Sequence, residues 1–178
     1  NTQENMDKIW QMYLDQNKAI QEALDTLCPE ICYQPSSPFR GYGKNKSPYE
    51  GDYHSWSVLS GSKPITYFEE GFSRFYSEYG YESFDYYESL VRYAPREEDQ
   101  RIYSDVMLWH QRQGYNAVRA NNNIIRYISD NYPAPKTFKD TLYASHVLQA
   151  DAVKLAIEAH RRNKGFCWGS LYWQLGNC

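Results

Sequence analysis

One acidic residue, Glu78, occupies a position where a carboxylate could do chemistry. It follows an apolar, aromatic run and precedes Gly80 by two positions, within residues 74–84 (Arg-Phe-Tyr-Ser-Glu-Tyr-Gly-Tyr-Glu-Ser-Phe). A strand ending there would present the carboxylate at the edge of a sheet, among aromatic rings. Cleavage of a glycosidic bond needs carboxyl groups as nucleophile, base or acid, and flat apolar surfaces for the sugar ring. The alternative interpretation is an exposed glutamate at a strand end with no chemical role.

Aromatic residues dominate the composition. The chain has 18 Tyr, 7 Phe and 5 Trp, which together make 17% of its residues. Tyrosine has an apolar ring face and a polar hydroxyl, which match the C–H faces and hydroxyl edges of a carbohydrate. A tyrosine-rich core and surface without any ligand would give the same composition, so composition alone leaves both interpretations open.

Length and charge narrow the class of protein. A chain of 178 residues is long enough for one domain with a sizeable core. A net charge of -3 and a pI of about 5.8 give no electrostatic reason to expect nucleic-acid binding. No apolar run approaches the roughly 20 residues that span a bilayer, so we expect no membrane segment. No secretory signal is visible, and the periplasm, the cell exterior and the lysosome all stay open as locations.

The four cysteines do not predict a metal site. Cys28 and Cys32 are four positions apart without a nearby histidine, which is not a usual zinc spacing, and Cys167 and Cys178 lie far along the chain. We therefore expect free thiols and no bound metal. A disulfide stays open as an alternative.

Hydrophobic periodicity and turn residues divide the chain into helices and strands. We expect strands at 31–34, 73–77 and 166–175, with a weak strand signal at 52–56, and helices at 6–27, 85–94, 97–113, 116–131 and from Thr137 to about 163. Thr137 with Asp140 has the form of a capping box. Residues 166–175 are apolar at nearly every position, which predicts a strand covered on both faces.

Strands separated by helices favour an α/β fold with a parallel sheet. The four candidate strands are too few to close an eight-stranded barrel.

Several segments of the chain resemble one family of enzymes. Residues 77–80 (Ser-Glu-Tyr-Gly), with Ser83-Phe84 shortly after, resemble the nucleophile motif of family 2 glycoside hydrolases of the β-mannosidase type. Residues 169–175 (Gly-Ser-Leu-Tyr-Trp-Gln-Leu) are similar to the last barrel strand of these enzymes. The similarity also includes, in the same order as in the family, residues 35–38, 51–56, 136–143 and 149–150.

The resemblance implies roles for four residues. Glu78 would be the nucleophile of a retaining β-mannosidase that removes terminal β-linked mannose, and no metal or organic cofactor would take part. His54 and Trp56 would lie near the sugar, and Trp173 would form part of the floor of the mannose subsite. From the residues alone, His54 could instead be a solvated loop residue, and Trp173 could belong to the core.

The resemblance also implies an incomplete fold. Residues 1–178 would be a partial catalytic domain, the second half of a (β/α)8 TIM barrel that is incomplete as a stand-alone barrel. The strand carrying the acid/base glutamate would lie outside this chain, which would be a fragment of a longer enzyme or one part of an assembly. Because a half barrel exposes unpaired strand edges, we expect it to pair with the missing N-terminal half or to self-associate.

Two departures from the family pattern keep other functions open. The family usually has Asn-Asp where this chain has Gly176-Asn177, and commonly has proline where it has Asp85. An inactive or truncated module that binds sugar, or only packs against a partner, is therefore one alternative. A family 2 glycosidase for another β-glycoside is a second.

Overall fold

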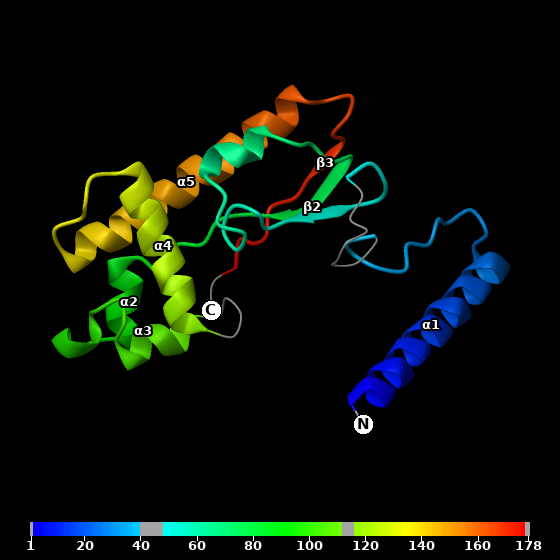
Figure 1. The fold of residues 1–178 in the computed structure, drawn as a ribbon, viewed down its shortest axis with the longest axis horizontal. Helices are drawn as coiled ribbons and strands as arrows, with labels where there is room; N and C mark the ends of the chain where they lie inside the picture. The colour runs from blue at the N-terminus through cyan, green and yellow to red at the C-terminus, as the bar shows by residue number, and fades with distance from the viewer. Residues whose placement is uncertain (1, 40–47, 112–115, 177–178) are drawn as a thin grey trace. The chain divides into compact units, whose positions relative to one another are not determined.

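The computed structural model describes residues 2–39, 48–111 and 116–176 of the chain (Figure 1). The chain forms two compact units, residues 1–46 and residues 47–178. No helix within the described ranges is long and apolar enough to cross a membrane.

The first unit is built on one long helix. Helix α1 spans Thr2–Leu27 and confirms the helix predicted at 6–27. The strand predicted at 31–34 is wrong, because this segment is mostly exposed and pairs with no strand in the described part of the chain. The segment is held to α1 by side chains instead. The Tyr13 hydroxyl donates to the Pro35 carbonyl oxygen at 2.8 Å, and the Tyr33 hydroxyl donates to Asn17 Oδ1 at 2.5 Å.

The second unit contains a parallel sheet of three short strands in the order β1-β2-β3. Strand β1 spans Tyr53–Ser55, β2 spans Phe75–Tyr79 and β3 spans Gly169–Ser170. Both strand pairs are parallel, as the alternation of strands and helices predicted. The α/β class is therefore confirmed. A short 3-10 helix, η1 at Ile65–Glu69, lies between β1 and β2 in the chain.

Two long helices follow the sheet's central strand in the chain. Helix α4 spans Ala117–Asn131 and α5 spans Phe138–Arg162, close to the bounds predicted from periodicity. The predicted capping box is confirmed, because the Thr137 hydroxyl accepts from the Asp140 N–H and the Asp140 carboxylate accepts from the Thr137 N–H. Helix α5 contacts α4 and η1 (Figure 1), and its buried residues supply Leu142, Leu148, Ala152 and Ala156 to the core.

The helix predicted at 97–113 is wrong as a single element. Helix α2 at Tyr87–Tyr93 confirms the helix predicted at 85–94. Residues 97–111 contain instead a 3-10 turn, η2 at Glu97–Asp99, and a separate short helix, α3 at Asp105–His110. Residues 112–113 of the prediction lie outside the described residues.

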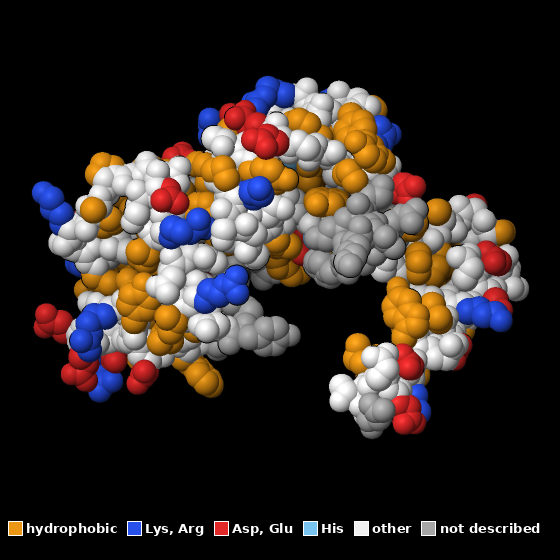
Figure 2. All heavy atoms as spheres, viewed as in Figure 1, with side chains coloured by type: hydrophobic (Ala, Val, Ile, Leu, Met, Phe, Trp, Pro, Cys, Tyr) orange, Lys and Arg blue, Asp and Glu red, His pale blue; other side chains and the backbone are white. Residues whose placement is uncertain are grey.

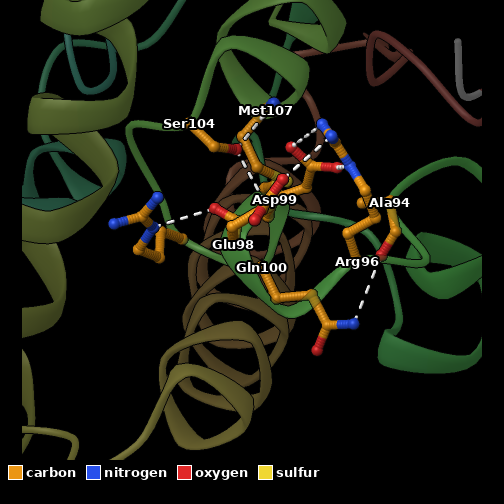
Figure 3. Close-up of polar contacts among 8 residues, drawn as sticks. Ala94, Arg96, Glu98, Asp99, Gln100, Ser104 and Met107 are labelled. Atoms are coloured by element: carbon orange, nitrogen blue, oxygen red, sulfur yellow. Dashed lines mark hydrogen bonds and ion pairs between the residues drawn. The ribbon is translucent and has the colours of Figure 1, made fainter.

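Local hydrogen bonds explain this break (Figure 3). Arg96 donates to both oxygens of the Asp99 carboxylate, from Nε at 2.7 Å and from Nη2 at 3.0 Å. The Ser104 hydroxyl donates to the Asp99 carbonyl oxygen at 2.6 Å and accepts from the Met107 N–H at 3.3 Å. These side chains compete with the backbone bonds of a continuous helix, so the chain turns and α3 begins anew with Ser104 as its N-cap.

The C-terminal strand differs most from its prediction. Only two residues of 166–175 are assigned to a strand, and β3 stands at the edge of the sheet formed by the described residues. Burial on both faces is wrong, since the large side chains here are exposed: Trp168, Leu171, Tyr172, Trp173 and Leu175. The apolar run thus predicts burial that the described residues of this chain do not supply.

A buried histidine connects α5 to the sheet. His160 is 3% exposed, its ring stacks on Tyr76 at 4.0 Å between centroids, and its Nδ1 lies 2.9 Å from Ser170 Oγ. The same Ser170 hydroxyl lies 2.9 Å from the Tyr79 hydroxyl. One helix is thereby joined to both β2 and β3. Burial lowers the pKa of His160 to about 4.

This histidine should make the fold sensitive to acid. In the unfolded chain the imidazole has its ordinary pKa of 6.5, whereas its pKa is about 4 when buried. Between these values the unfolded chain binds more protons than the folded chain. The free energy of unfolding should therefore decrease as the pH is lowered, by up to about 3 kcal/mol. Urea unfolding between pH 7 and pH 4 should show this slope in the wild type and a shallower slope in His160→Phe, which keeps the aromatic stack. Equal slopes would contradict this assignment.

Candidate functional site

Strand β2 contains one extra residue relative to β1 and to the segment that follows β3. On the β1 side, Tyr53 pairs with Tyr76 but the next residue, His54, pairs with Glu78. On the β3 side, the N–H groups of Leu171 and Trp173, two positions apart, donate to the carbonyl oxygens of Tyr76 and Tyr79, three positions apart. The strand therefore bulges between positions 76 and 79, and Ser77 has no partner in the β1 register.

The bulge changes which way the side chains of β2 point. In a regular strand Tyr76 and Tyr79 would lie on opposite faces, because side chains alternate. Here both rings are buried and both contact His160 of α5, with centroid distances of 4.0 Å and 4.7 Å. The two residues between them, Ser77 and Glu78, both make their polar contacts with residues at or beside β1 instead.

Glu78 is held through one of its two carboxylate oxygens. Trp56 Nε1 donates to Oε2 at 3.1 Å, and His54 Nδ1 lies 3.3 Å from the same oxygen. The Glu78 side chain is 23% exposed, and that of His54 is 6% exposed. No described residue hydrogen-bonds to Oε1. A carboxylate with one oxygen held and the other unpaired is arranged so that one oxygen can react while the other is fixed.

A second carboxylate lies behind His54. Asp52 Oδ2 is 3.8 Å from His54 Nε2, and it accepts a hydrogen bond of 2.5 Å from the Ser77 hydroxyl. The Asp52 side chain is 9% exposed. The imidazole of His54 therefore stands between two carboxylates, one facing each ring nitrogen.

Gly80 brings the end of β2 against the chain at Trp173. A Cβ atom at position 80 would lie 2.5 Å from the Trp173 carbonyl oxygen and 3.7 Å from the Trp56 ring. The Trp173 N–H in turn donates to the Tyr79 carbonyl oxygen at 2.8 Å. Only glycine permits this approach, so Gly80 positions Trp173 beside the strand end that carries Glu78.

The structure thus brings together the four residues singled out from the sequence. His54 and Trp56 contact Glu78 directly, and Trp173 is placed nearby through the backbone of Tyr79 and Gly80. The interpretation of His54 as a solvated loop residue is wrong, because its side chain is 6% exposed. The interpretation of Trp173 as core is also wrong, because it is 54% exposed.

Helix α5 fixes the segment that follows Glu78. Gln149 Nε2 donates to the Tyr81 carbonyl oxygen at 2.6 Å, and Gln149 Oε1 accepts from the Ser83 hydroxyl at 2.9 Å. The Phe84 N–H donates to the Ser145 hydroxyl at 3.1 Å. These bonds attach residues 81–84 to one face of the helix, so the chain after the strand end cannot move freely.

Glu82 is a titratable group that the sequence motifs do not single out. Its Oε2 is buried and lacks a hydrogen-bond partner among the described residues. Burial raises the pKa of Glu82 to about 7, and a hydrogen bond from the Gln111 side chain opposes this shift in part. A second glutamate four positions after Glu78 was the available signal, but sequence alone does not reveal its burial.

The described residues contain no group of three or more His, Cys, Asp and Glu side chains suited to hold a metal ion. Cys28, Cys32 and Cys167 are free thiols, and Cys178 lies outside the described residues.

Comparison with known proteins identifies relatives over nearly the whole chain. No family model matches it. The chain is 30% identical over 166 residues to "Beta-mannosidase B" of Aspergillus flavus and, likewise, to that of Aspergillus terreus, an alignment covering 90% of this chain. The structure of a beta-D-mannosidase from Dictyoglomus thermophilum matches with a TM-score of 0.65 and 30% identity over 72% of this chain. The chain belongs to a β-mannosidase-like family.

The matches cover most of this chain but only a small part of each relative. The chain spans 19% of the length of the Aspergillus relatives and 15% of the Dictyoglomus chain. The resemblance read from residues 77–84 and 169–175 to enzymes of the β-mannosidase type is confirmed by these relatives.

We predict that Gly80→Ala destabilises the protein. The new methyl group would overlap the Trp173 carbonyl oxygen, a backbone atom that cannot rotate away, at an expected cost of about 1–3 kcal/mol. Urea unfolding measures this change. Gly176→Ala is the control, because its Cβ would meet only a flexible Gln174 side chain at 3.5 Å. Equal effects of the two substitutions would contradict the assigned role of Gly80.

We predict that Glu82→Gln stabilises the protein at neutral pH. The folded-state pKa of this carboxyl, about 7, is above its ordinary value of 4.5, so ionisation disfavours the fold as pH rises between these values. Glutamine has the same shape without this penalty. The variant should match the wild type near pH 4.5 and exceed it by up to about 3 kcal/mol at pH 8. A pH-independent difference in urea unfolding would show that Glu82 does not titrate in this way.

Proposed function

We propose that the chain supplies the nucleophile side of a glycosidase active site that acts on terminal β-D-mannosides. The observation that carries this proposal is the arrangement of Glu78, whose Oε2 is held by Trp56 and His54 while Oε1 has no described hydrogen-bond partner. The names of the relatives, beta-mannosidase B and beta-D-mannosidase, supply the substrate class.

The reaction follows the retaining scheme. Oε1 of Glu78 attacks the anomeric carbon, the bond from that carbon to the leaving oxygen breaks, and a general acid gives the leaving oxygen a proton. Water then gives a proton to the same acid/base group, now acting as a base, and attacks the anomeric carbon of the glycosyl-enzyme, which releases mannose and the free carboxylate. The contacts of Trp56 and His54 with Oε2 would keep the carboxylate oriented through both steps.

The side chains around Glu78 suit a sugar. We assign His54 and Trp56 to the wall of the mannose subsite and Trp173 to its floor, where an indole face can stack on the C–H face of a pyranose ring. The 54% exposure of Trp173 supports this role, because a ring facing a substrate must be accessible.

We further propose that residues 1–178 are part of one catalytic domain, the second half of a (β/α)8 barrel. The parallel sheet supports this, as does the small share of the relatives' length that the chain spans. The general acid would then come from the N-terminal half, which would cover the edge of β3 and the exposed side chains of Leu171 and Tyr172 that follow it. Helix α1 buries none of its residues within this chain and would pack in the same domain.

A non-catalytic sugar-binding module is the second candidate. The sequence Gly176-Asn177 favours it, because it lacks the Asn-Asp pair usual for the family next to Trp173. Such a module would bind mannosides through the same aromatic residues without turning them over.

One experiment separates these functions. The whole protein that carries this chain is incubated with a 2-deoxy-2-fluoro-β-mannoside bearing an activated leaving group, and the labelled peptide is located by mass spectrometry. We expect the label on Glu78, and we expect Glu78→Gln to lose both labelling and hydrolysis, by at least about 1,000-fold. Glu88→Gln on the exposed side of α2 is the control and should react normally.

Binding of the inhibitor without any covalent label would favour the sugar-binding module. Labelling at another carboxylate would exclude Glu78 as the nucleophile.

A further inference from the structure

We propose that Ser77 and Asp52 are positioning residues for the nucleophile. In this proposal they fix the ring of His54, and His54 with Trp56 fixes Glu78. The inference rests on the proposed function, in which Glu78 attacks the sugar, and it adds two residues to which neither the motifs nor the relatives' names assign a role.

The contacts form an unbroken chain. The Ser77 hydroxyl donates to Asp52 Oδ2 at 2.5 Å, the same oxygen lies 3.8 Å from His54 Nε2, and His54 Nδ1 lies 3.3 Å from Glu78 Oε2. Asp52 and His54 have side-chain exposures of 9% and 6%. Because water has little access to these groups, the contacts between them help to satisfy their polar atoms.

The two carboxylates select one orientation of the imidazole. With Nε2 toward Asp52 and Nδ1 toward Glu78, each carboxylate faces a ring nitrogen. A half-turn of the ring would place carbon atoms where the two nitrogens now face the carboxylates. Asp52 therefore supports the ring orientation in which Nδ1 faces Glu78.

The bulge makes this arrangement possible. In a regular strand, Ser77 and Glu78 would point to opposite faces of the sheet. With the extra residue in β2, both reach the side of β1 on which Asp52, His54 and Trp56 lie at alternate positions. Ser77 thus belongs to the site because of the register shift, and its bond to Asp52 holds the bulged residue in place.

Loss of this support should affect the reaction more than substrate binding. A nucleophile displaced by a fraction of an ångström reacts more slowly, whereas the aromatic surfaces that bind the sugar stay in place.

The test uses Ser77→Ala and Asp52→Asn in the whole protein. We expect each substitution to slow labelling of Glu78 by the fluoromannoside, and to lower kcat, by about 10- to 100-fold, with KM changed by less than about threefold. Ser77→Thr keeps the hydroxyl and should label at close to the wild-type rate. Melting temperatures of all variants are measured in parallel, so that a variant that fails to fold is recognised and the other carries the test.

Asp151→Asn is the matched control. Asp151 on α5 accepts a hydrogen bond from the Tyr132 hydroxyl at an exposed position, so it loses the same kind of contact away from Glu78. It should label normally.

Three outcomes overturn the inference. Wild-type labelling rates in folded Ser77→Ala and Asp52→Asn would show that Glu78 needs neither residue. Equal slowing in Ser77→Thr and Ser77→Ala would show that the hydroxyl is not the cause, and equal slowing in Asp151→Asn would show a general effect on the fold. In each case labelling of Glu78 in the wild type would leave the proposed function intact, whereas its absence would reject that function itself.

Discussion

The candidate site depends on one irregularity of the backbone, the extra residue in β2. It allows the neighbouring rings of Tyr76 and Tyr79 to pack against His160 on the helix side, while Ser77 and Glu78 face the residues of β1. A regular strand would have to bury Glu78 beside Tyr76 or expose one of the rings. The bulge resolves this conflict, and every contact of the carboxylate follows from it.

Sequence patterns located most helices because their signals are local. Helices α1, α4 and α5 have apolar periodicity or a capping box, and their bounds were close to those observed. The prediction of one helix at 97–113 was wrong because the side chains of Asp99 and Ser104 bond to nearby groups and interrupt the helix. Periodicity does not detect such bonds. The prediction of a buried strand at 166–175 was wrong because apolar composition predicts burial but does not indicate which part of a protein packs over the strand.

The site was predictable only in part. Motif resemblance pointed to Glu78, His54, Trp56 and Trp173, and local physics alone left each with a second interpretation. The contact between Ser77 and Asp52 could not be predicted, because it depends on a register shift between β1 and β2. Glu82 was missed because its burial depends on the packing of residues around it rather than on its own type.

A crystal structure of the whole protein after reaction with the fluoromannoside tests the central claim most directly. We expect electron density joining Glu78 to the anomeric carbon, Tyr76 and Tyr79 both against His160, and Ser77 bonded to Asp52. A regular ladder through positions 76–79, with Glu78 on the same face as Tyr76 and the sugar attached elsewhere, would contradict it.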